Sequence, residues 1–151
     1  MIQRTETQNL TIRSATLADA LQLAPLTAQL GYPSTAEKIA GRLREILGET
    51  KHLILVAEHK QFQIVGYVEA FPFTTIASDR RLEIAGLVVD EACRSQGVGR
   101  LLMLRAEDWA RANGYKETRL RSNVIREGAH RFYENLGYRL NKTQKSFLKT
   151  L

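Results

Sequence analysis

The stretch Arg94-Ser95-Gln96-Gly97-Val98-Gly99-Arg100 decides how the rest of the chain is interpreted. It follows the apolar run Leu87-Val88-Val89 and leads into Leu101-Leu102-Met103-Leu104, a pattern typical of a strand, a turn and the start of a helix. Glycine lets a backbone pass close to a ligand, and the first amides of a helix are unpaired and carry positive dipole character. The junction therefore suits a phosphate or pyrophosphate group.

Two common phosphate-binding motifs do not fit this turn. A P-loop ends in Gly-Lys-Ser or Gly-Lys-Thr, whereas Gly99 is followed by Arg100 and Leu101. A dinucleotide fingerprint needs a third glycine at the position that Leu102 occupies. The pattern that remains, R-x-x-G-x-G after a strand, also occurs in loops that only make a tight turn, so it needs support from elsewhere in the chain.

That support is a second motif, which runs from Arg126 to Tyr138 and contains Ala129-His130-Arg131-Phe132-Tyr133. Together the motifs resemble the signature of the GNAT superfamily of acetyl-CoA-dependent N-acetyltransferases, L-x-V and R-x-x-G-x-G followed by A-x-x-F-Y-x-x-x-G-Y/F. Two motifs in the family's order are more specific than either alone. The resemblance extends from Leu82 to the end of the chain. It implies an α+β, GNAT-like acyl-CoA N-acyltransferase fold, with a mixed, largely antiparallel central sheet flanked by about four helices.

The composition is that of an ordinary globular protein. A length of 151 residues, 44% of them hydrophobic and 25% charged, predicts a single domain over residues 1–151. The one cysteine, Cys93, excludes an internal disulfide and fits a reducing cytoplasm. No apolar run approaches the roughly 18 residues of a membrane span, and the first residues lack the apolar core of a signal peptide. We therefore expect a cytoplasmic protein with no membrane partner.

The formal net charge of +6 raises the question of nucleic-acid binding, which needs basic residues gathered on one face. Here the basic residues are scattered. The densest group, Arg119, Arg121, Arg126 and Arg131, lies near the two motifs, where a phosphate-rich coenzyme explains it equally well. We therefore expect no nucleic-acid partner.

Hydrophobic periodicity and turn residues predict the order of helices and strands. Strands are expected at residues 10–13, 52–58, 63–71, 82–89 and 117–124, with a last strand pair within 138–148. Helices are expected at residues 16–30, 35–47, 98–112 and 127–135. Residues 78–80 are expected to form a loop.

The resemblance implies acetyl-CoA as cosubstrate and no metal. In the family, two neighbouring parallel strands splay apart, and the pantetheine arm pairs with the exposed backbone as an added strand does. The matching segments are residues 87–89 and 117–123. Arg126 stands where many relatives carry an asparagine that contacts the coenzyme, so either Asn123 or Arg126 itself takes that contact. The cofactor-binding residues implied are Leu87, Val88, Val89, Arg94, Ser95, Gln96, Gly97, Val98, Gly99, Arg100, Asn123, Arg126 and Phe132.

Two residues are candidates for catalysis. Tyr133 matches the family tyrosine that donates a proton to the coenzyme sulfur, and its alternative role is packing beside Phe132. Glu83 lies on the predicted strand 82–89, as does the glutamate that several members use as a base. Its alternative roles are attraction of a cationic substrate and pairing with Arg80 or Arg81.

Three further polar residues carry weaker signals. His130 precedes Tyr133 by one helical turn, where packing is as plausible as catalysis. Cys93 has no partner spacing that marks a nucleophile, and the three histidines have no metal-ligand spacing.

The combined prediction is an enzyme of the acyltransferase class, of the small, single-domain bacterial GNAT type. It moves an acetyl group to a primary amine by direct attack in a ternary complex. The C-terminal region resembles members that acetylate small amines, including aminoalkylphosphonates, so a small molecule is the expected substrate ahead of a protein amine. The alternatives are a catalytically silent acyl-CoA-binding sensor and a nucleic-acid or scaffold protein. A homodimer is a further possibility that the family suggests.

Overall fold

The computed structural model describes residues 9–49, 51–61, 63–122 and 124–151. The chain divides into two compact units, Met1–Leu120 and Arg121–Leu151, and each unit is described by itself. The expectation of a single domain over residues 1–151 stays a prediction.

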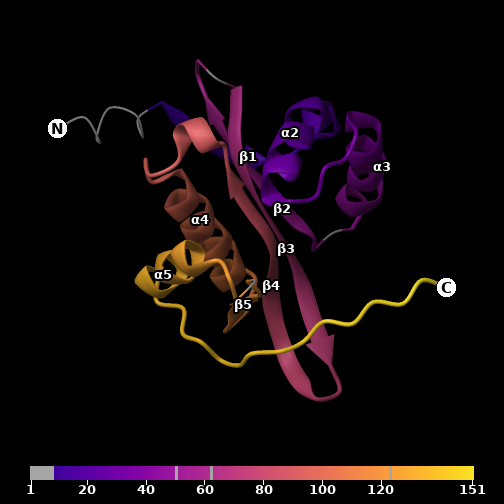
Figure 1. The fold of residues 1–151 in the computed structure, drawn as a ribbon, viewed down its shortest axis with the longest axis vertical. Helices are drawn as coiled ribbons and strands as arrows, with labels where there is room; N and C mark the ends of the chain where they lie inside the picture. Colours follow the sequence, from indigo (N-terminus) through magenta and orange to yellow (C-terminus); the bar gives the residue numbers. More distant parts are fainter. Residues whose placement is uncertain (1–8, 50, 62, 123) are drawn as a thin grey trace. The chain divides into compact units, whose positions relative to one another are not determined.

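The first unit is built on a five-stranded sheet in the order β1-β2-β3-β4-β5 (Figure 1). Neighbouring strands pair antiparallel except β4 and β5, which are parallel. The expected mixed, largely antiparallel sheet is thereby confirmed. The strands are β1 (Leu10–Ser14), β2 (Leu53–His59), β3 (Gln63–Thr75), β4 (Ser78–Val89) and β5 (Thr118–Leu120).

Helices of the first unit begin and end near the residues that the sequence indicates. They are α2 (Ala20–Leu30), α3 (Ala36–Leu47) and α4 (Val98–Ala112). Thr35 caps α3, because its side chain accepts a hydrogen bond from the Lys38 amide at 3.2 Å. Gly31 ends α2 with a left-handed φ of 109°, a conformation that glycine adopts without steric strain. No helix in the part of the chain that the structure describes is long and apolar enough to cross a membrane.

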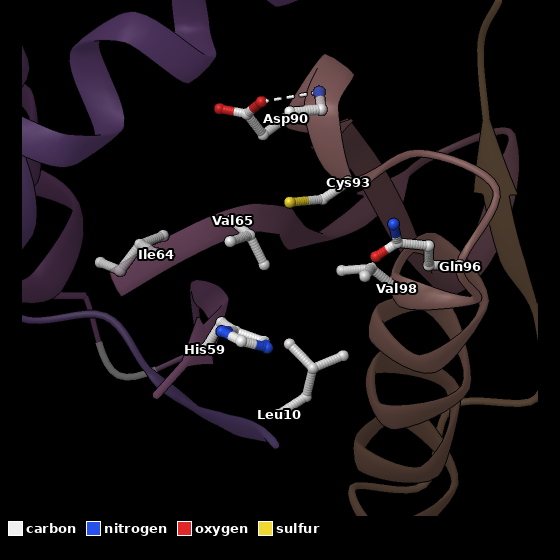
Figure 2. Close-up of a pocket in the computed structure, with 9 residues that line it drawn as sticks. Leu10, His59, Ile64, Val65, Asp90, Cys93, Gln96 and Val98 are labelled. Atoms are coloured by element: carbon white, nitrogen blue, oxygen red, sulfur yellow. Dashed lines mark hydrogen bonds between the residues drawn. The ribbon is translucent and has the colours of Figure 1, made fainter. Parts of the chain in front are cut away.

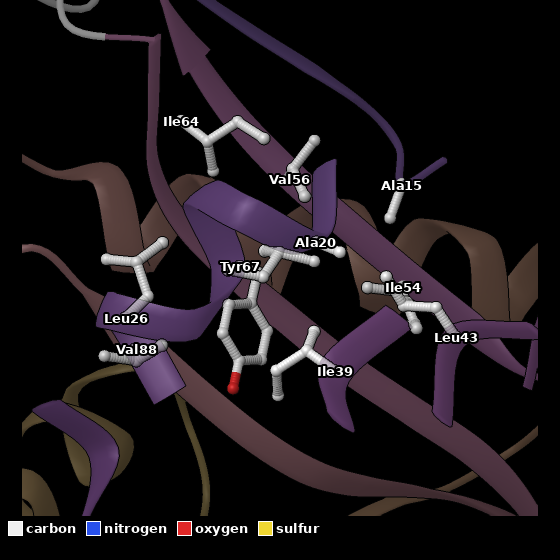
Figure 3. Close-up of a cluster of buried hydrophobic side chains, with 11 residues drawn as sticks. Ala15, Ala20, Leu26, Ile39, Leu43, Ile54, Val56, Ile64, Tyr67 and Val88 are labelled. Carbon is white, nitrogen blue, oxygen red and sulfur yellow. The ribbon is translucent and has the colours of Figure 1, made fainter. Parts of the chain in front are cut away.

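The main core lies between the sheet and the pair α2–α3 (Figure 3). Tyr67 of β3 is buried there, and its hydroxyl lies 3.0 Å from the Thr27 hydroxyl of α2. Because side chains alternate along a strand, the neighbouring Gly66 faces the opposite side of the sheet, where a Cβ atom added to it would meet Leu102 of α4. The two helical layers therefore cover opposite faces. The cluster on the α2–α3 face contains Ala15, Ala20, Leu23, Leu26, Ile39, Leu43, Ile54, Val56, Ile64, Tyr67 and Val88.

Three register shifts interrupt the pairing of β2, β3 and β4; one lies near the hairpin end, between Phe73 and Thr75, and the other two are bulges in the body of the sheet. In β3, Gly66 pairs with Ala57 and Ile64 pairs with Glu58, so Val65 is the extra residue. In β4, Gly86 pairs with Glu69 and Ile84 pairs with Ala70, so Ala85 is the extra residue. Each bulge moves the next side chains to the other face.

Three sequence-based expectations for strands are corrected. Residues 78–80 belong to β4, because Ser78 pairs with Thr75 across a tight turn at Ile76 and Ala77. Among the described residues, the strand expected at 117–124 is confined to Thr118–Leu120, whose parallel pairing with β4 runs from Leu82 to Ile84. The pair expected within 138–148 is wrong, because these residues form no strand and an alternating pattern becomes a strand only beside a partner.

The second unit contains one helix, α5 (Glu127–Asn135), as the sequence predicts. Gly137 follows the helix with a φ of 94°. Tyr133 packs edge-on against Phe132 and Tyr138, with ring centroids 5.2 and 6.0 Å apart. The residues that follow Tyr138 are exposed, so these ring contacts are the main packing described for the second unit.

A substitution at Gly66 tests how closely β3 packs against β4 and α4. A Cβ atom at this position meets the Val88 carbonyl oxygen at 2.8 Å and Leu102 Cδ1 at 3.3 Å. We expect Gly66→Ala to lower the free energy of unfolding by about 2 kcal/mol, because the backbone of β4 has to move. Urea denaturation measures the change.

Gly41 provides the matched control, because it lies inside α3, where an added Cβ would meet no atom within 4 Å in the part of the chain that the structure describes, apart from the helix backbone itself. Gly41→Ala is expected to raise the free energy of unfolding by up to about 1 kcal/mol. Equal effects of the two alanines would contradict the packing argument.

Candidate active site

The glycine turn has a backbone that only a few residue types adopt readily. Gly97 precedes α4 with a φ of 83°, and Ser95 has a φ of 64°. Both values are left-handed, and an L side chain at Gly97 is strained even though no atom of the described residues lies within 4 Å of an added Cβ. The glycine is therefore required by the shape of the turn.

Hydrogen bonds fix the turn to the end of β4. The Asp90 amide donates to the Val65 carbonyl at 2.7 Å, and the Asp90 carboxylate accepts from the Ala92 amide at 2.9 Å. Arg94 Nε donates to the Val89 carbonyl at 3.1 Å, so this guanidinium binds the strand that the turn leaves. The position of the turn is thus set by β3 and β4.

Helix α4 begins directly after the turn and supplies backbone donors. Its first internal hydrogen bond runs from the Leu101 amide to the Gly97 carbonyl at 3.0 Å. The helical pattern therefore gives the amides of Val98, Gly99 and Arg100 no acceptor within the helix. Val98 is 2% exposed and anchors this end of α4 in the core. A turn followed by rigid helix amides fits the phosphates of a nucleotide coenzyme.

The edge of β4 toward β5 is paired over a short length only. β5 pairs with Leu82–Ile84, and β4 continues to Val89 with no further partner on that side in the described part of the chain. This places the Leu87–Val89 backbone where an extended ligand can add as a strand. Asn123, at the end of the predicted partner segment, lies outside the described residues.

A cavity of about 380 Å³ borders the glycine turn (Figure 2). Gln96 and Val98 line it from the turn, and the half-buried Cys93 lines it from the preceding segment. His59 and Leu10 close it from the ends of β2 and β1. Glu83 is not among the residues that line it, so this cavity is separate from the carboxylate that the sequence singles out.

Glu83 lies in a row of side chains that crosses the sheet. It pairs with Phe71 of β3 on one side and with Arg119 of β5 on the other. His52, just before β2, completes the row, since its ring centroid lies 5.8 Å from that of Phe71. Directly opposite residues project from the same face of a sheet, so these four side chains lie side by side. We call His52, Phe71, Glu83 and Arg119 the cross-strand row.

A buried ion pair holds Glu83 within this row. Arg119 Nε lies 2.7 Å from Glu83 Oε2, and the side chains are 19% and 7% exposed. The sequence suggested Arg80 or Arg81 as partners, but Arg80 donates to the Asn113 carbonyl at 2.7 Å and Arg81 lies over the Phe73 ring. Arg119 was missed because only the parallel register of β4 and β5 brings it to Glu83.

A second polar pair lies beside the row and was also missed. His52 Nε2 lies 2.8 Å from Glu69 Oε1, and the His52 side chain is 12% exposed. Glu69 is next to Tyr67 on the same face of β3. No spacing in the sequence connects these residues, since β2 and β3 bring them together.

In the second unit, Tyr133 is half-buried in α5. Burial raises the pKa of the Tyr133 phenol above its ordinary value of 10.0, and the positive charge of Arg126 acts in the opposite direction. Arg126 is exposed at the N-terminal end of α5, and Phe132 contacts the Tyr133 ring. The phenol is therefore protonated at neutral pH, although the raised pKa makes it a weaker proton donor than an exposed tyrosine.

Metal-ligating side chains do not cluster in the described part of the chain. No group of three or more histidine, cysteine, aspartate or glutamate residues there is arranged to hold a metal ion.

Comparisons with known proteins agree with this arrangement. A model described as the acetyltransferase (GNAT) family matches residues 18–138. The uncharacterized N-acetyltransferase YhdJ of Bacillus subtilis is 32% identical over 115 residues, which cover 76% of this chain and 80% of that protein. The aminoalkylphosphonate N-acetyltransferase of Salmonella typhimurium is 44% identical over 57 residues, or 38% of this chain and 37% of that protein. The aminoglycoside N-acetyltransferase AAC(6')-Iy, solved with CoA, aligns over 94% of this chain and 95% of its own with a TM-score of 0.82; at 16% identity it shows a common fold.

Gly97 tests the role of the turn. We expect Gly97→Ala to weaken acetyl-CoA binding about tenfold, because a Cβ at a left-handed φ costs roughly 1–2 kcal/mol and moves the amides that follow. Calorimetric titration measures the dissociation constant. Gly114→Ala is the control, because Gly114 has a φ of 80° at the other end of α4. A similar loss of affinity in both variants would count against the turn as the coenzyme site.

Proposed function

The chain belongs to the acetyltransferase (GNAT) family and is an acetyl-CoA-dependent N-acetyltransferase, and we propose that its acceptor is the primary amine of a small molecule. In this proposal the amine attacks the acetyl group directly within a ternary complex. The observation that supports acetyl-CoA as the acetyl donor is the glycine turn. It joins the β4 edge, which has no further partner among the described residues, to the first amides of α4. One strand thus leads to both parts of a coenzyme site.

When bound, the coenzyme supplies an activated acetyl thioester. The proposed phosphate contacts come from the amides of residues 96–100, supported by Arg94 and Ser95, and the pantetheine contacts from the backbone of Leu87, Val88 and Val89. Arg126, Phe132 and Asn123 are proposed as further contacts on the basis of the family motif. The left-handed Gly97 and the unpartnered β4 edge support these assignments.

Glu83 is proposed to act on the acceptor amine. An amine attacks only as the neutral base, so the proton of the ammonium form must leave first. A buried carboxylate held by Arg119 attracts the ammonium group and accepts that proton directly or through water. Attraction alone is the alternative role, and the two differ in their dependence on pH.

Tyr133 is proposed as the general acid. The family motif matches it to the tyrosine that protonates the departing thiolate, and its phenol is protonated at neutral pH, as this role requires. Packing against Phe132 and Tyr138 holds the ring in one orientation. No covalent enzyme intermediate is needed for this transfer.

Cytoplasmic location and a homodimer are further parts of the proposal, and both derive from the sequence and the family. Relatives act on aminoalkylphosphonates and aminoglycosides, as their names state, so a small amine is favoured over a protein amine. A coenzyme-binding sensor without chemistry and a nucleic-acid or scaffold protein are the competing functions.

Titration with acetyl-CoA, with ATP and NAD in parallel, tests the proposal first. Selective binding with a micromolar dissociation constant, followed by thiol release in the presence of an amine, is the expected result. Selective binding without thiol release for any amine indicates a sensor, and absence of binding removes the coenzyme site.

Tyr133→Phe tests the general acid. We expect the variant to lose about a hundredfold in kcat, because the phenylalanine ring keeps the packing but has no proton to donate. The acetyl-CoA dissociation constant should stay close to that of the parent protein. A variant with full turnover would exclude the acid role.

Glu83→Gln distinguishes a base from simple attraction. If Glu83 is the base, the variant loses activity at neutral pH and regains it at high pH, where the amine is already neutral. The kcat/KM profile between neutral and alkaline pH measures this recovery. A uniform loss across the profile assigns Glu83 to substrate attraction.

A further inference from the structure

The cross-strand row continues into a pair of arginines around one aromatic ring. The guanidinium carbon of Arg119 lies 4.7 Å from the Phe73 ring centroid, and that of Arg81 lies 5.9 Å from it. Phe73 and Arg81 are paired residues of β3 and β4, and Phe73 lies two positions beyond Phe71 on the same face. Two positive charges therefore lie next to Glu83.

Each guanidinium has a buried nitrogen without a hydrogen-bond partner. Arg119 Nη2 and Arg81 Nε are buried and have no hydrogen-bond acceptor among the described residues. The other donor of Arg119, Nε, donates to Glu83. A buried N–H group that lacks an acceptor is destabilising, and guanidinium groups match carboxylate and phosphonate oxygens well. The two nitrogens point to an anionic group that is bound during function.

Opposite charges lie side by side on this face. Glu83 and Arg119 are on neighbouring strands, about 4.8 Å apart along the hydrogen-bonding direction. A ligand with an ammonium group near Glu83 and an anionic group near the arginines meets the complementary charge at both ends. A polycation instead places a positive charge against two guanidinium groups, which repel it.

We propose, on the basis of the acetyltransferase function above, that the acceptor is a short amine that also carries a carboxylate or phosphonate group. Arg81 and Arg119 bind the anionic group, and Glu83 receives the amine. In the reaction the ammonium group first gives a proton to Glu83 or to water, and the neutral nitrogen then forms a bond to the acetyl carbon. The carbon–sulfur bond breaks, the nitrogen loses a second proton, and the thiolate takes up one proton, so that one proton in total is released to water. The anionic group is unchanged and serves only to position the substrate.

Matched substrate pairs test this inference. Thiol release is measured with β-alanine against β-alaninamide, with aminomethylphosphonate against its diethyl ester, and with spermidine. We expect the kcat/KM of each amine with a free acid group to exceed that of its amide or ester by about tenfold to a hundredfold. Hydrogen bonds to a charged group contribute free energies of this size. Spermidine should be the poorest substrate.

Arg81→Gln identifies the residue responsible, since it leaves the Glu83–Arg119 pair in place. The ratio of kcat/KM for an anionic amine to its uncharged counterpart should fall toward one in this variant and in Arg119→Gln. Arg44→Gln, on the exposed face of α3, removes the same charge and should keep the ratio. Acetyl-CoA titration confirms that each variant is folded.

The outcomes separate the two proposals. If amines are acetylated but the parent ratio is near one, or spermidine is preferred, the anionic acceptor is wrong and the acetyltransferase function stands. An equal fall in the ratio for Arg44→Gln would assign the preference to overall charge and overturn the role of Arg81. If no amine supports thiol release, both proposals fail.

Discussion

The bulge at Ala85 is the constraint on which the rest of the site depends. Without an extra residue, Glu83 and Val88 would project from opposite faces of β4, because side chains alternate along a strand. The bulge reverses the alternation, so Glu83 lies on the same face as the buried Val88 and opposite Phe71. The carboxylate therefore joins His52 and Arg119, while its neighbours Leu82 and Ile84 stay buried on the other face.

A single strand connects the two parts of the proposed chemistry. β4 carries Glu83 within its parallel pairing with β5 and ends at Val89. There the Asp90 amide donates to the Val65 carbonyl and Arg94 donates to the Val89 carbonyl, and both bonds fix the glycine turn. Since a paired strand is stiff, the carboxylate and the turn are held at a fixed separation. Among the described residues, the same strand has no partner on this edge between them, because the pairing with β5 ends at Ile84.

The face of the sheet toward α2 and α3 is apolar around Tyr67 and polar around Phe73. Around Tyr67 the sheet is covered by α2 and α3, and the contacts are those of an ordinary core. Around Phe73 the same face carries a carboxylate and two guanidinium groups, and two of their buried nitrogens have no acceptor among the described residues. Buried charged groups of this kind contribute little to stability unless they are fully paired, so their presence is better explained by binding than by folding.

The sequence by itself determined the elements whose signals are local. Thr35, Gly31 and Gly137 mark helix ends through capping and left-handed φ values, and Gly97 marks the turn for the same reason. The family motifs also indicated the acetyltransferase. The sequence could not indicate the bulges, the short length of β5, the loss of the strands expected within 138–148, or the partners of Glu83 and His52. These features depend on which strands lie next to each other and in what register, and register is set by packing between segments far apart in the chain.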